Sequence, residues 1–455
     1  MVKKKVVSAM LATTMMAALL SGCGSSKSAG ATNGGKVLNI SCWNEEFKSR
    51  ITAHYPGYVE VDSTHGKIGD VSVNWNITAN QDNAYQNKLD ENLLKQDKAA
   101  ADDKIDIFLV EADYALKYVD TDYALPLSKL GIKDADLSKQ YQYTKDVVTD
   151  SKGQLKGASW QGCPGAVFYR RDIAKEVLGT DDPAEVQKYI ADWDKFVETA
   201  DKMKTAGYKI TSSVNDTFRV YSNNVTSKWV TDNKISIDAN IMKWVEDSKA
   251  LVDAGETETY ELWSDDWSKG FWKDGDVFCY FGPAWFINFS MSCDQEGSVG
   301  YDGQWGATVG PQGCFWGGTW ICAAKGTDNA DLVKDIILKM TTDDDVMTEI
   351  VVEDDDFVNN KTVMEGLANG TKLVKQEDGT EVPYTSKVLG GQNPLAMYCE
   401  GAAKIDLSNQ GAYDQGCNEG FQKSMKEYFN GNATLDEALD LFYKTVEEKY
   451  PGLTH

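Results

Sequence analysis

Short apolar runs that favour strands alternate with helical apolar stripes along the chain from residue 37 onward, and this alternation limits the fold more than any other feature. Val37 to Trp43 and Ile105 to Val110 are continuous β-prone runs, and Val71 to Ile77 alternates apolar with polar side chains. Between them, residues 82 to 98 carry Tyr85 and Leu89 on one helical stripe. Strand, helix, strand with buried apolar strands predicts an α/β chain with a parallel sheet covered by helices.

The same pattern returns after Gly157, so we expect a second α/β region. Helical stripes end at Gly207 and Gly255, where glycine suits a left-handed C-terminal cap. Thr434 and Glu437 have the spacing of a capping box and open a last helix. Further strands are expected at residues 166–169, 277–281 and 319–323, and a further helix from about residue 329. A length of 455 residues fits two or three domains of this kind.

Composition excludes several classes of function. The formal net charge is −24, and a chain without clustered Lys and Arg does not suit a phosphate backbone, so no nucleic acid is expected as a partner. Only three His occur, His54, His65 and His455, which argues against a multi-His metal site and against most Ser-His or Cys-His catalytic sites. We expect no metal, no cofactor and no catalytic residues.

The N-terminus has the pattern of an export signal. Lys3 to Lys5 precede an apolar stretch from Val6 to Leu20, and Leu20-Ser-Gly-Cys23 resembles the lipobox of bacterial lipoproteins. Residues 1–22 are therefore expected to be a lipoprotein signal peptide, and Cys23 the acylated first residue of the mature chain. The Gly- and Ser-rich residues 23–35 would form a flexible tether. The alternative is an ordinary secretory signal with an incidental Cys.

Cysteines and carboxylate runs are interpreted structurally. Eight Cys remain after Cys23, and residues such as Cys42 and Cys279 lie in apolar strand-like runs, which favours buried thiols over disulfides. The runs Asp343 to Asp345 and Glu353 to Asp356 lack the pattern of a calcium-binding EF-hand loop. They are expected to be solvated charges at helix ends.

Several segments follow one another in a characteristic order, beginning with the lipobox and tether. The others are Asp106 to Asp113, Tyr123-Ala-Leu-Pro-Leu127, Gly157-Ala-Ser-Trp-Gln161 with Phe168-Tyr-Arg-Arg-Asp172, Asp192-Trp-Asp-Lys-Phe196, and Phe271 to Phe278 with Phe281-Gly-Pro-Ala-Trp285. Together they resemble family 1 extracellular solute-binding proteins, the sugar-capturing lipoproteins of ABC importers, a family that includes maltose-binding protein. Arg171 replaces the usual Lys, and residues 47–69 depart from the family pattern.

The resemblance implies a two-lobed periplasmic-binding-protein-like fold, each lobe a sheet flanked by helices, with a ligand cleft at the hinge. It places residues 36–157 with 312–345 in the N-lobe and residues 158–311 with 346–455 in the C-lobe. It also implies a monomer that captures a carbohydrate, an oligosaccharide, and delivers it to the transmembrane permease subunits of an ABC transporter. The protein would sit on the extracellular face of the bacterial cytoplasmic membrane, anchored by lipid on Cys23.

Aromatic faces and carboxylates are the chemistry that suits a sugar, because sugar rings present apolar C–H faces and hydroxyl groups. Trp residues at expected strand ends or at the lobe crossing, and polar residues after a strand, are the candidate ligand contacts. They are Trp43, Asn44, Glu45, Glu46, Asp113, Trp160, Trp285, Trp316 and Trp320. The choice of Asp113 as a candidate rests on the matched family segment. Each Trp would equally suit a core, and residues 44–46 would equally suit a solvated helix start, whereas Trp193, Trp229 and Trp244 are expected in helix packing.

The sequence leaves alternatives open. The ligand could also be a peptide, a polyamine or an anion, although the few Lys and Arg at the expected strand ends argue against an anion. A surface-anchored glycoside hydrolase would use the same aromatic and acidic content, with two carboxylates brought together by folding. A pure adhesin would not call for a two-lobed α/β organisation. Binding of a sugar without release of reducing ends would distinguish the binding protein from the hydrolase.

Overall fold

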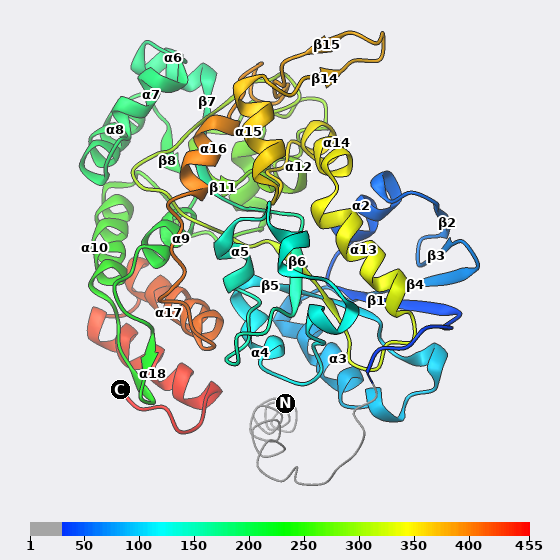
Figure 1. Cartoon of the computed structure of the whole chain (residues 1–455). Helices are drawn as coiled ribbons and strands as arrows, with labels where there is room; N and C mark the ends of the chain where they lie inside the picture. Colours follow the sequence, from blue (N-terminus) through cyan, green and yellow to red (C-terminus); the bar gives the residue numbers. More distant parts are fainter. Residues whose placement is uncertain (1–29) are drawn as a thin grey trace. The chain divides into compact units, whose positions relative to one another are not determined.

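A computed structural model describes residues 30–455, so the expected signal peptide and Cys23 lie outside the described residues. The chain divides into two compact units (Figure 1). Unit 1 holds the described residues up to Trp160, with Gly318–Glu349 and Lys449–Pro451. Unit 2 holds Gln161–Gly317, Ile350–Glu448 and Gly452–His455. The lobe boundaries that the resemblance implied differ from these units at residues 158–160, 312–317, 346–349 and 449–451, so that Trp160 lies in unit 1 and Trp316 in unit 2.

Unit 1 is built on a seven-stranded sheet in the order β2-β3-β4-β1-β5-β13-β6. Its strands are β1 (Val37–Cys42), β2 (Tyr58–Asp62), β3 (His65–Ile68), β4 (Val71–Ile77), β5 (Ile107–Glu111), β6 (Gly157–Ser159) and β13 (Thr319–Ala323). Its helices are α2 (Glu46–His54), α3 (Ala84–Leu93), α4 (Ala115–Val119), α5 (Gln142–Asp146) and α13 (Ala330–Thr342), and α14 (Asp344–Asp354) begins in this unit.

The central strands confirm the α/β prediction, but the sheet is mixed. β4, β1 and β5 are parallel neighbours, whereas β13 runs antiparallel to both β5 and β6, and β2 and β3 form an antiparallel hairpin at one edge. β1 and β5 are buried along nearly their whole length. The buried Asp106 carboxylate accepts hydrogen bonds from the Asn39 backbone (2.9 Å) and the Asn329 side chain (3.1 Å), and so joins β1 to the start of α13.

The last part of the predicted tether belongs to this unit. The Thr32 and Gly35 backbone N–H groups donate to Thr327 and Asp328 carbonyls at 3.0 and 2.9 Å, and the Asn33 side chain donates to Asp331 at 2.7 Å. The expectation of a flexible tether up to residue 35 is therefore wrong for these residues, because they pair with the turn that precedes α13.

Unit 2 is built on a four-stranded sheet in the order β12-β7-β11-β8. Its strands are β7 (Gly165–Arg170), β8 (Lys209–Thr211), β11 (Val277–Pro283) and β12 (Trp305–Thr308), with small hairpins β9 (Val230–Thr231), β10 (Lys234–Ile235), β14 (Val374–Lys375) and β15 (Glu381–Val382). Its helices are α6 (Arg171–Leu178), α7 (Pro183–Tyr189), α8 (Trp193–Thr205), α9 (Asn215–Asn223), α10 (Ala239–Ala254), α11 (Asp265–Ser268), α12 (Trp285–Ser290), α15 (Lys361–Asn369), α16 (Leu395–Ala402), α17 (Asp414–Phe429) and α18 (Leu435–Lys449).

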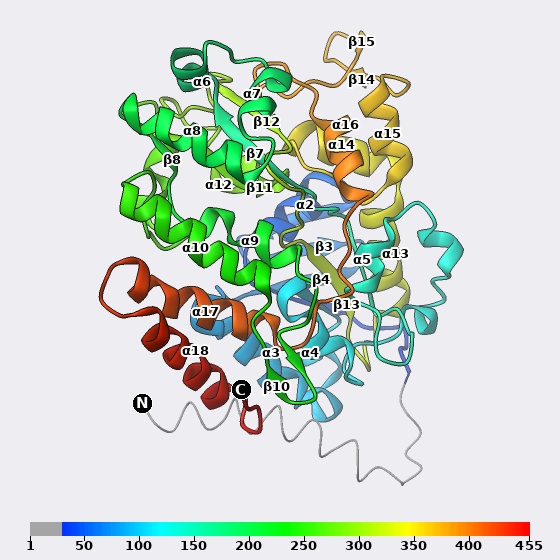
Figure 2. The same ribbon diagram turned by 90° about the vertical axis from the view of Figure 1, so that its left-hand side faces the viewer.

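Local signals in unit 2 were read correctly. Gly207 and Gly255 follow α8 and α10 with φ of 93° and 72°, the left-handed conformation expected of such glycines. The Glu437 N–H donates to Thr434 Oγ1 (3.3 Å), and the Thr434 N–H donates to Glu437 Oε2 (2.8 Å), which confirms the capping box of α18. Figure 2 shows α17 and α18 side by side, with α10 next to α17.

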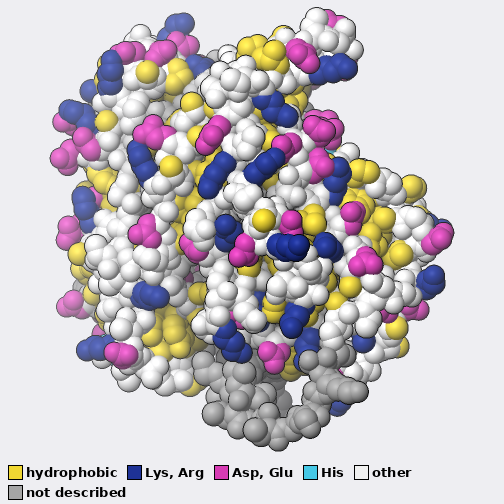
Figure 3. All heavy atoms as spheres, viewed as in Figure 1, with side chains coloured by type: hydrophobic (Ala, Val, Ile, Leu, Met, Phe, Trp, Pro, Cys, Tyr) yellow, Lys and Arg dark blue, Asp and Glu magenta, His cyan; other side chains and the backbone are white. Residues whose placement is uncertain are grey.

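Two further observations concern the surface and the thiols. On the face drawn in Figure 3, acidic and basic side chains are interspersed. Within residues 30–455, no helix combines the length and apolarity needed to cross a bilayer. The expectation of buried cysteines is confirmed for six of the eight, and burial raises the pKa of the Cys42, Cys314 and Cys322 thiols to about 12. Cys293 and Cys399 are partly exposed.

Candidate functional site

One edge of the unit 1 sheet gathers several of the predicted residues. Because β4, β1 and β5 are parallel neighbours, the segments that follow them emerge at the same edge. β13 runs the other way, and its first residue, Thr319, pairs with the last residue of β5, Glu111. Thr319 Oγ1 lies 3.4 Å from Glu46 Oε2. The start of β13 therefore meets the segment after β1 at this edge.

The Trp43 ring packs against two tyrosine rings at this edge. Its ring meets Tyr85 at 5.7 Å and Tyr114 at 6.2 Å between centroids, both edge to face. Tyr85 is held by hydrogen bonds that its hydroxyl donates to the Leu109 and Ser41 carbonyls, at 2.6 and 3.1 Å. Burial raises the pKa of both tyrosines well above the usual value. Two neutral, buried rings thus support Trp43, which is itself only partly buried.

The acidic candidates lie in the segments that follow β1 and β5. The Asn44 side chain accepts from the Glu46 backbone N–H (3.1 Å), so the segment after β1 turns directly into α2, and Glu45 is exposed. Asp113 is partly exposed, and its backbone N–H donates to the Glu111 carboxylate at 2.9 Å. Sequence reasoning did not name Glu111 or Tyr114. Both could have been suggested by their position at the end of β5.

A third segment at this edge was misread as helix. The sequence predicted a helix over 82–98, but α3 begins at Ala84, and Asp82 and Asn83 have φ of 52° and 60°. Asp and Asn tolerate the left-handed conformation, and two such residues in succession interrupt an α-helix. Asn80 Oδ1 is buried there without a hydrogen-bond partner. In the sequence, the run of polar residues from Asn80 to Asn83 was the feature that could have indicated a non-helical segment here.

In unit 2 a group of exposed rings forms what we call the aromatic platform, defined as Trp263, Trp285, Phe289 and Trp316. Trp285 follows β11 as the first residue of α12, and its indole N–H donates to the Trp316 carbonyl at 3.3 Å. The Trp285 and Trp316 rings lie 5.9 Å apart, and both are partly exposed. The structure thus brings these two predicted residues together.

The other two platform rings were not predicted. Trp263 and Phe289 are 51% and 52% exposed, and their rings lie 6.4 and 6.1 Å from that of Trp285. Beneath the platform, buried Trp267 lies 5.1 Å from Trp263, and buried Phe286 lies 6.2 Å from Trp285. A layer of buried aromatic rings therefore packs beneath the exposed and partly exposed rings of the platform.

Two predicted site residues are in the core instead. Trp160 is fully buried and stacks on Phe47 at 5.3 Å, and Trp320 is 1% exposed with its indole N–H donating to the Thr144 carbonyl at 2.7 Å. Neither presents a ring face to solvent in this structure. For these two residues the alternative of a core position holds, because Trp160 packs on Phe47 of α2 and Trp320 bonds to Thr144 of α5.

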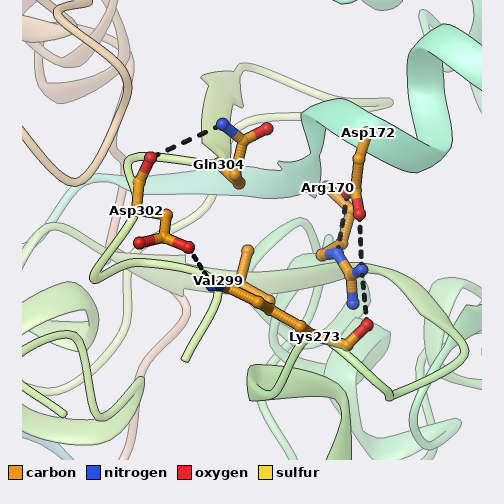
Figure 4. Close-up of a pocket in the computed structure, with 6 residues that line it drawn as sticks. All are labelled: Arg170, Asp172, Lys273, Val299, Asp302 and Gln304. Atoms are coloured by element: carbon orange, nitrogen blue, oxygen red, sulfur yellow. Dashed lines mark hydrogen bonds and ion pairs between the residues drawn. The ribbon is translucent and has the colours of Figure 1, made fainter. Parts of the chain in front are cut away.

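A separate polar pocket of about 340 Å³ lies in unit 2 (Figure 4). Its lining residues are Arg170, Asp172, Lys273, Val299, Asp302 and Gln304. The Arg170 guanidinium donates hydrogen bonds to the Asp172 carboxylate, at 2.8 and 2.6 Å, and to the backbone carbonyls of residues 272, 273 and 275. β7 ends at Arg170, whereas its first residue, Gly165, pairs with Pro283 near Trp285. Six residues of strand, about 17 Å, thus separate this pocket from the platform.

The carboxylate runs have structural roles. Asp343 Oδ1 accepts from the backbone N–H groups of Asp345 and Val346 and so caps the start of α14. Asp356 is 1% exposed and accepts from the Gln161 side chain at 3.0 Å, and Tyr384 donates to Asp355 at 2.5 Å. Because Asp356 is buried, the expectation of solvated charges is wrong for this residue, whereas Asp355 is partly exposed. Among residues 30–455, no three His, Cys, Asp or Glu side chains cluster as metal ligands.

Comparison with known proteins adds to this geometry. The profile of a family described as bacterial extracellular solute-binding protein matches residues 65–373. A comparison with curated protein sequences found no match.

Solved structures share the fold. The crystal structure of an extracellular solute-binding protein of family 1 has a TM-score of 0.68 at 17% identity, covering 91% of this chain and 99% of its own. The ABC transporter associated binding protein of B. animalis subsp. lactis, in complex with beta-1,6-galactobiose, has a TM-score of 0.66 at 19% identity, with coverages of 92% and 99%. Maltose-bound T. maritima MalE3 has 0.63 at 14% identity, with coverages of 90% and 99%.

Proposed function

Since the chain belongs to the bacterial extracellular solute-binding protein family, we propose that it captures an oligosaccharide outside the cell and delivers it to the permease subunits of an ABC transporter. The observation that carries the proposal is the aromatic platform. Partly exposed aromatic faces seated on a buried aromatic layer are suited to the apolar faces of sugar rings. The complexes of structural neighbours with galactobiose and maltose support the same ligand class.

The edge of the unit 1 sheet is a second candidate surface, considered by itself, and it carries polar side chains. Glu46 and Asp113 would accept hydrogen bonds from sugar hydroxyls, and Trp43 would offer a further ring. Glu45, Asn44 and Glu111 lie in the same two segments and are secondary candidates. Trp160 and Trp320 are not part of the proposed site, because they are buried.

The family consists of binding proteins, and nothing in the described residues favours the hydrolase alternative. A glycoside hydrolase would release reducing ends, whereas a binding protein retains its ligand unchanged. We also propose that the protein is a monomer held at the membrane by lipid on Cys23.

Calorimetry of the purified mature chain against mono- and oligosaccharides tests the main proposal. We expect saturable binding of at least one oligosaccharide, with no new reducing ends after prolonged incubation. Release of reducing ends would indicate the hydrolase. Binding of amino acids, peptides or polyamines in place of any saccharide would overturn the ligand class.

A further inference from the structure

Trp263 occupies a backbone position that disfavours a large side chain. The Ser264 N–H donates to the Glu261 carbonyl at 3.2 Å, which closes a four-residue turn with Trp263 as its third residue. Trp263 has φ of 71° there. A turn with positive φ at its third residue ordinarily takes glycine or asparagine at that position.

No other aromatic residue among the described residues has positive φ. The remaining non-glycine residues with positive φ are Asp82, Asn83, Cys163, Asp232, Asn233, Ser292 and Asp355, which are mostly the Asp and Asn that tolerate this conformation. A bulky residue in this region is an outlier. Strain of this kind persists at ligand clamps and binding sites.

The strained turn presents the Trp263 ring to solvent instead of burying it. The ring is 51% exposed, although Trp267 and Phe286 pack against it at 5.1 and 6.1 Å. Its plane is inclined by only 26° to that of Trp285, at 6.4 Å between centroids. The two indole planes are thus roughly parallel, and both rings are at least partly exposed, so that one extended ligand can contact both.

Trp263 lies against two other rings of the platform, Trp285 at 6.4 Å and Trp316 at 5.8 Å between centroids. Trp285 contacts both Trp263 and Phe289, whose rings lie within 6.4 Å of it. A ligand of one sugar ring covers about one indole face. Contact with Trp285 and Trp263 together needs a longer one.

We propose that Trp263 is a ligand-contacting residue that makes the site prefer saccharides of two or more rings over the corresponding monosaccharide. This inference rests on the proposed function. The turn at residues 261–264 then has a role in specificity. Glycine at position 263 would remove the backbone strain, but it would also remove the ring that contacts the ligand.

The test compares W263G, W263F and the wild type as the full mature chain. The probes are glucose, galactose, maltose, maltotriose and beta-1,6-galactobiose, extended to manno- and xylo-oligosaccharides. D232G is the matched control, because Asp232 has φ of 52° and is exposed in the β9–β10 turn. Calorimetry gives Kd, and thermal scans give Tm.

We expect W263G to weaken binding of those oligosaccharides that the wild type binds by about tenfold, and binding of the monosaccharide much less. The Tm should be unchanged or raised. W263F should restore most of the affinity, and D232G should leave Kd unchanged. Unchanged oligosaccharide affinity in W263G, or an equal loss for every chain length, overturns the inference and leaves the proposed function standing. A wild type that binds no saccharide at all overturns both.

Discussion

The indole N–H of Trp267 donates to the buried carboxylate of Asp216 at 2.7 Å, and this bond fixes the ring on which Trp263 rests. The other carboxylate oxygen of Asp216 accepts from the Ser213 backbone N–H at 2.8 Å. Although both bonds favour the ionised form, burial dominates and raises the pKa of Asp216 to about 7. The base of the platform therefore contains a carboxyl group that titrates near neutrality.

Stability should fall as pH rises because of Asp216. Its pKa is about 7 in the folded chain against 3.8 when exposed, so the folded state binds the extra proton between these values. The favourable contribution is complete below about pH 4 and is lost as pH rises through about 7. We expect the free energy of unfolding of the wild type, relative to D216N, to decline by up to about 4 kcal/mol across this window. Chemical denaturation at pH 4, 5.5, 7 and 8 measures it, and parallel curves for the two proteins would contradict it.

Trp285 and Trp244 should separate binding from stability. Trp285→Ala removes a partly exposed platform ring and is expected to weaken saccharide binding by roughly 1–3 kcal/mol, about 5- to 150-fold in Kd, with stability largely kept. Trp244 is fully buried against Phe218 and Phe429, so Trp244→Ala should cost about 3–5 kcal/mol of stability. Its affinity per folded molecule should not change. The reverse pattern in calorimetry and denaturation would mean that the platform is structural.

Asp113 is expected to contribute to binding through hydrogen bonds to sugar hydroxyls. Asp113→Ala should weaken binding by about 1–3 kcal/mol, because the hydroxyls would lose a charged acceptor in a desolvated site. Asp70→Ala removes the same charge from an exposed position in the same unit and is the control. Equal Kd values for the two variants would remove Asp113 from the site.

Lipid anchoring is testable without a ligand. Cells that express the wild type should incorporate labelled palmitate into the protein, and Cys23→Ala should abolish the label. The wild type should fractionate with membranes. Recovery of unlabelled wild-type protein in the medium would count against the anchor.

Ligand binding should change the relative arrangement of the two units. The chain passes from unit 2 to unit 1 at Gly317 and Gly318, whose positive φ angles of 72° and 98° are adopted most readily by glycine. We expect the radius of gyration from small-angle scattering to fall at saturating saccharide. Superimposable profiles with and without a ligand of known occupancy would contradict a hinge.

Patterns confined to a few neighbouring residues were sufficient for much of the fold. Strand alternation located β4, and glycine after an apolar stripe located the ends of α8 and α10. The spacing of Thr434 and Glu437 located the start of α18. These features are decided by local backbone geometry and by which side of one element is apolar, so they can be read without knowing the fold. The position of Trp43 directly after β1 was likewise read from a local pattern, whereas Asp113 was taken from the family resemblance.

The direction of individual side chains was decided only by the tertiary structure. Trp160 is buried because Phe47 of α2, far away in sequence, stacks on it, whereas Trp285 stays partly exposed above Phe286. Asp356 is buried because Gln161 reaches it. Trp263 gave no signal of its own, since its left-handed backbone and its aromatic neighbours exist only once the turn is folded onto α11 and α12. Burial is a sum over contacts between distant residues, and the sequence alone does not specify which of those contacts form.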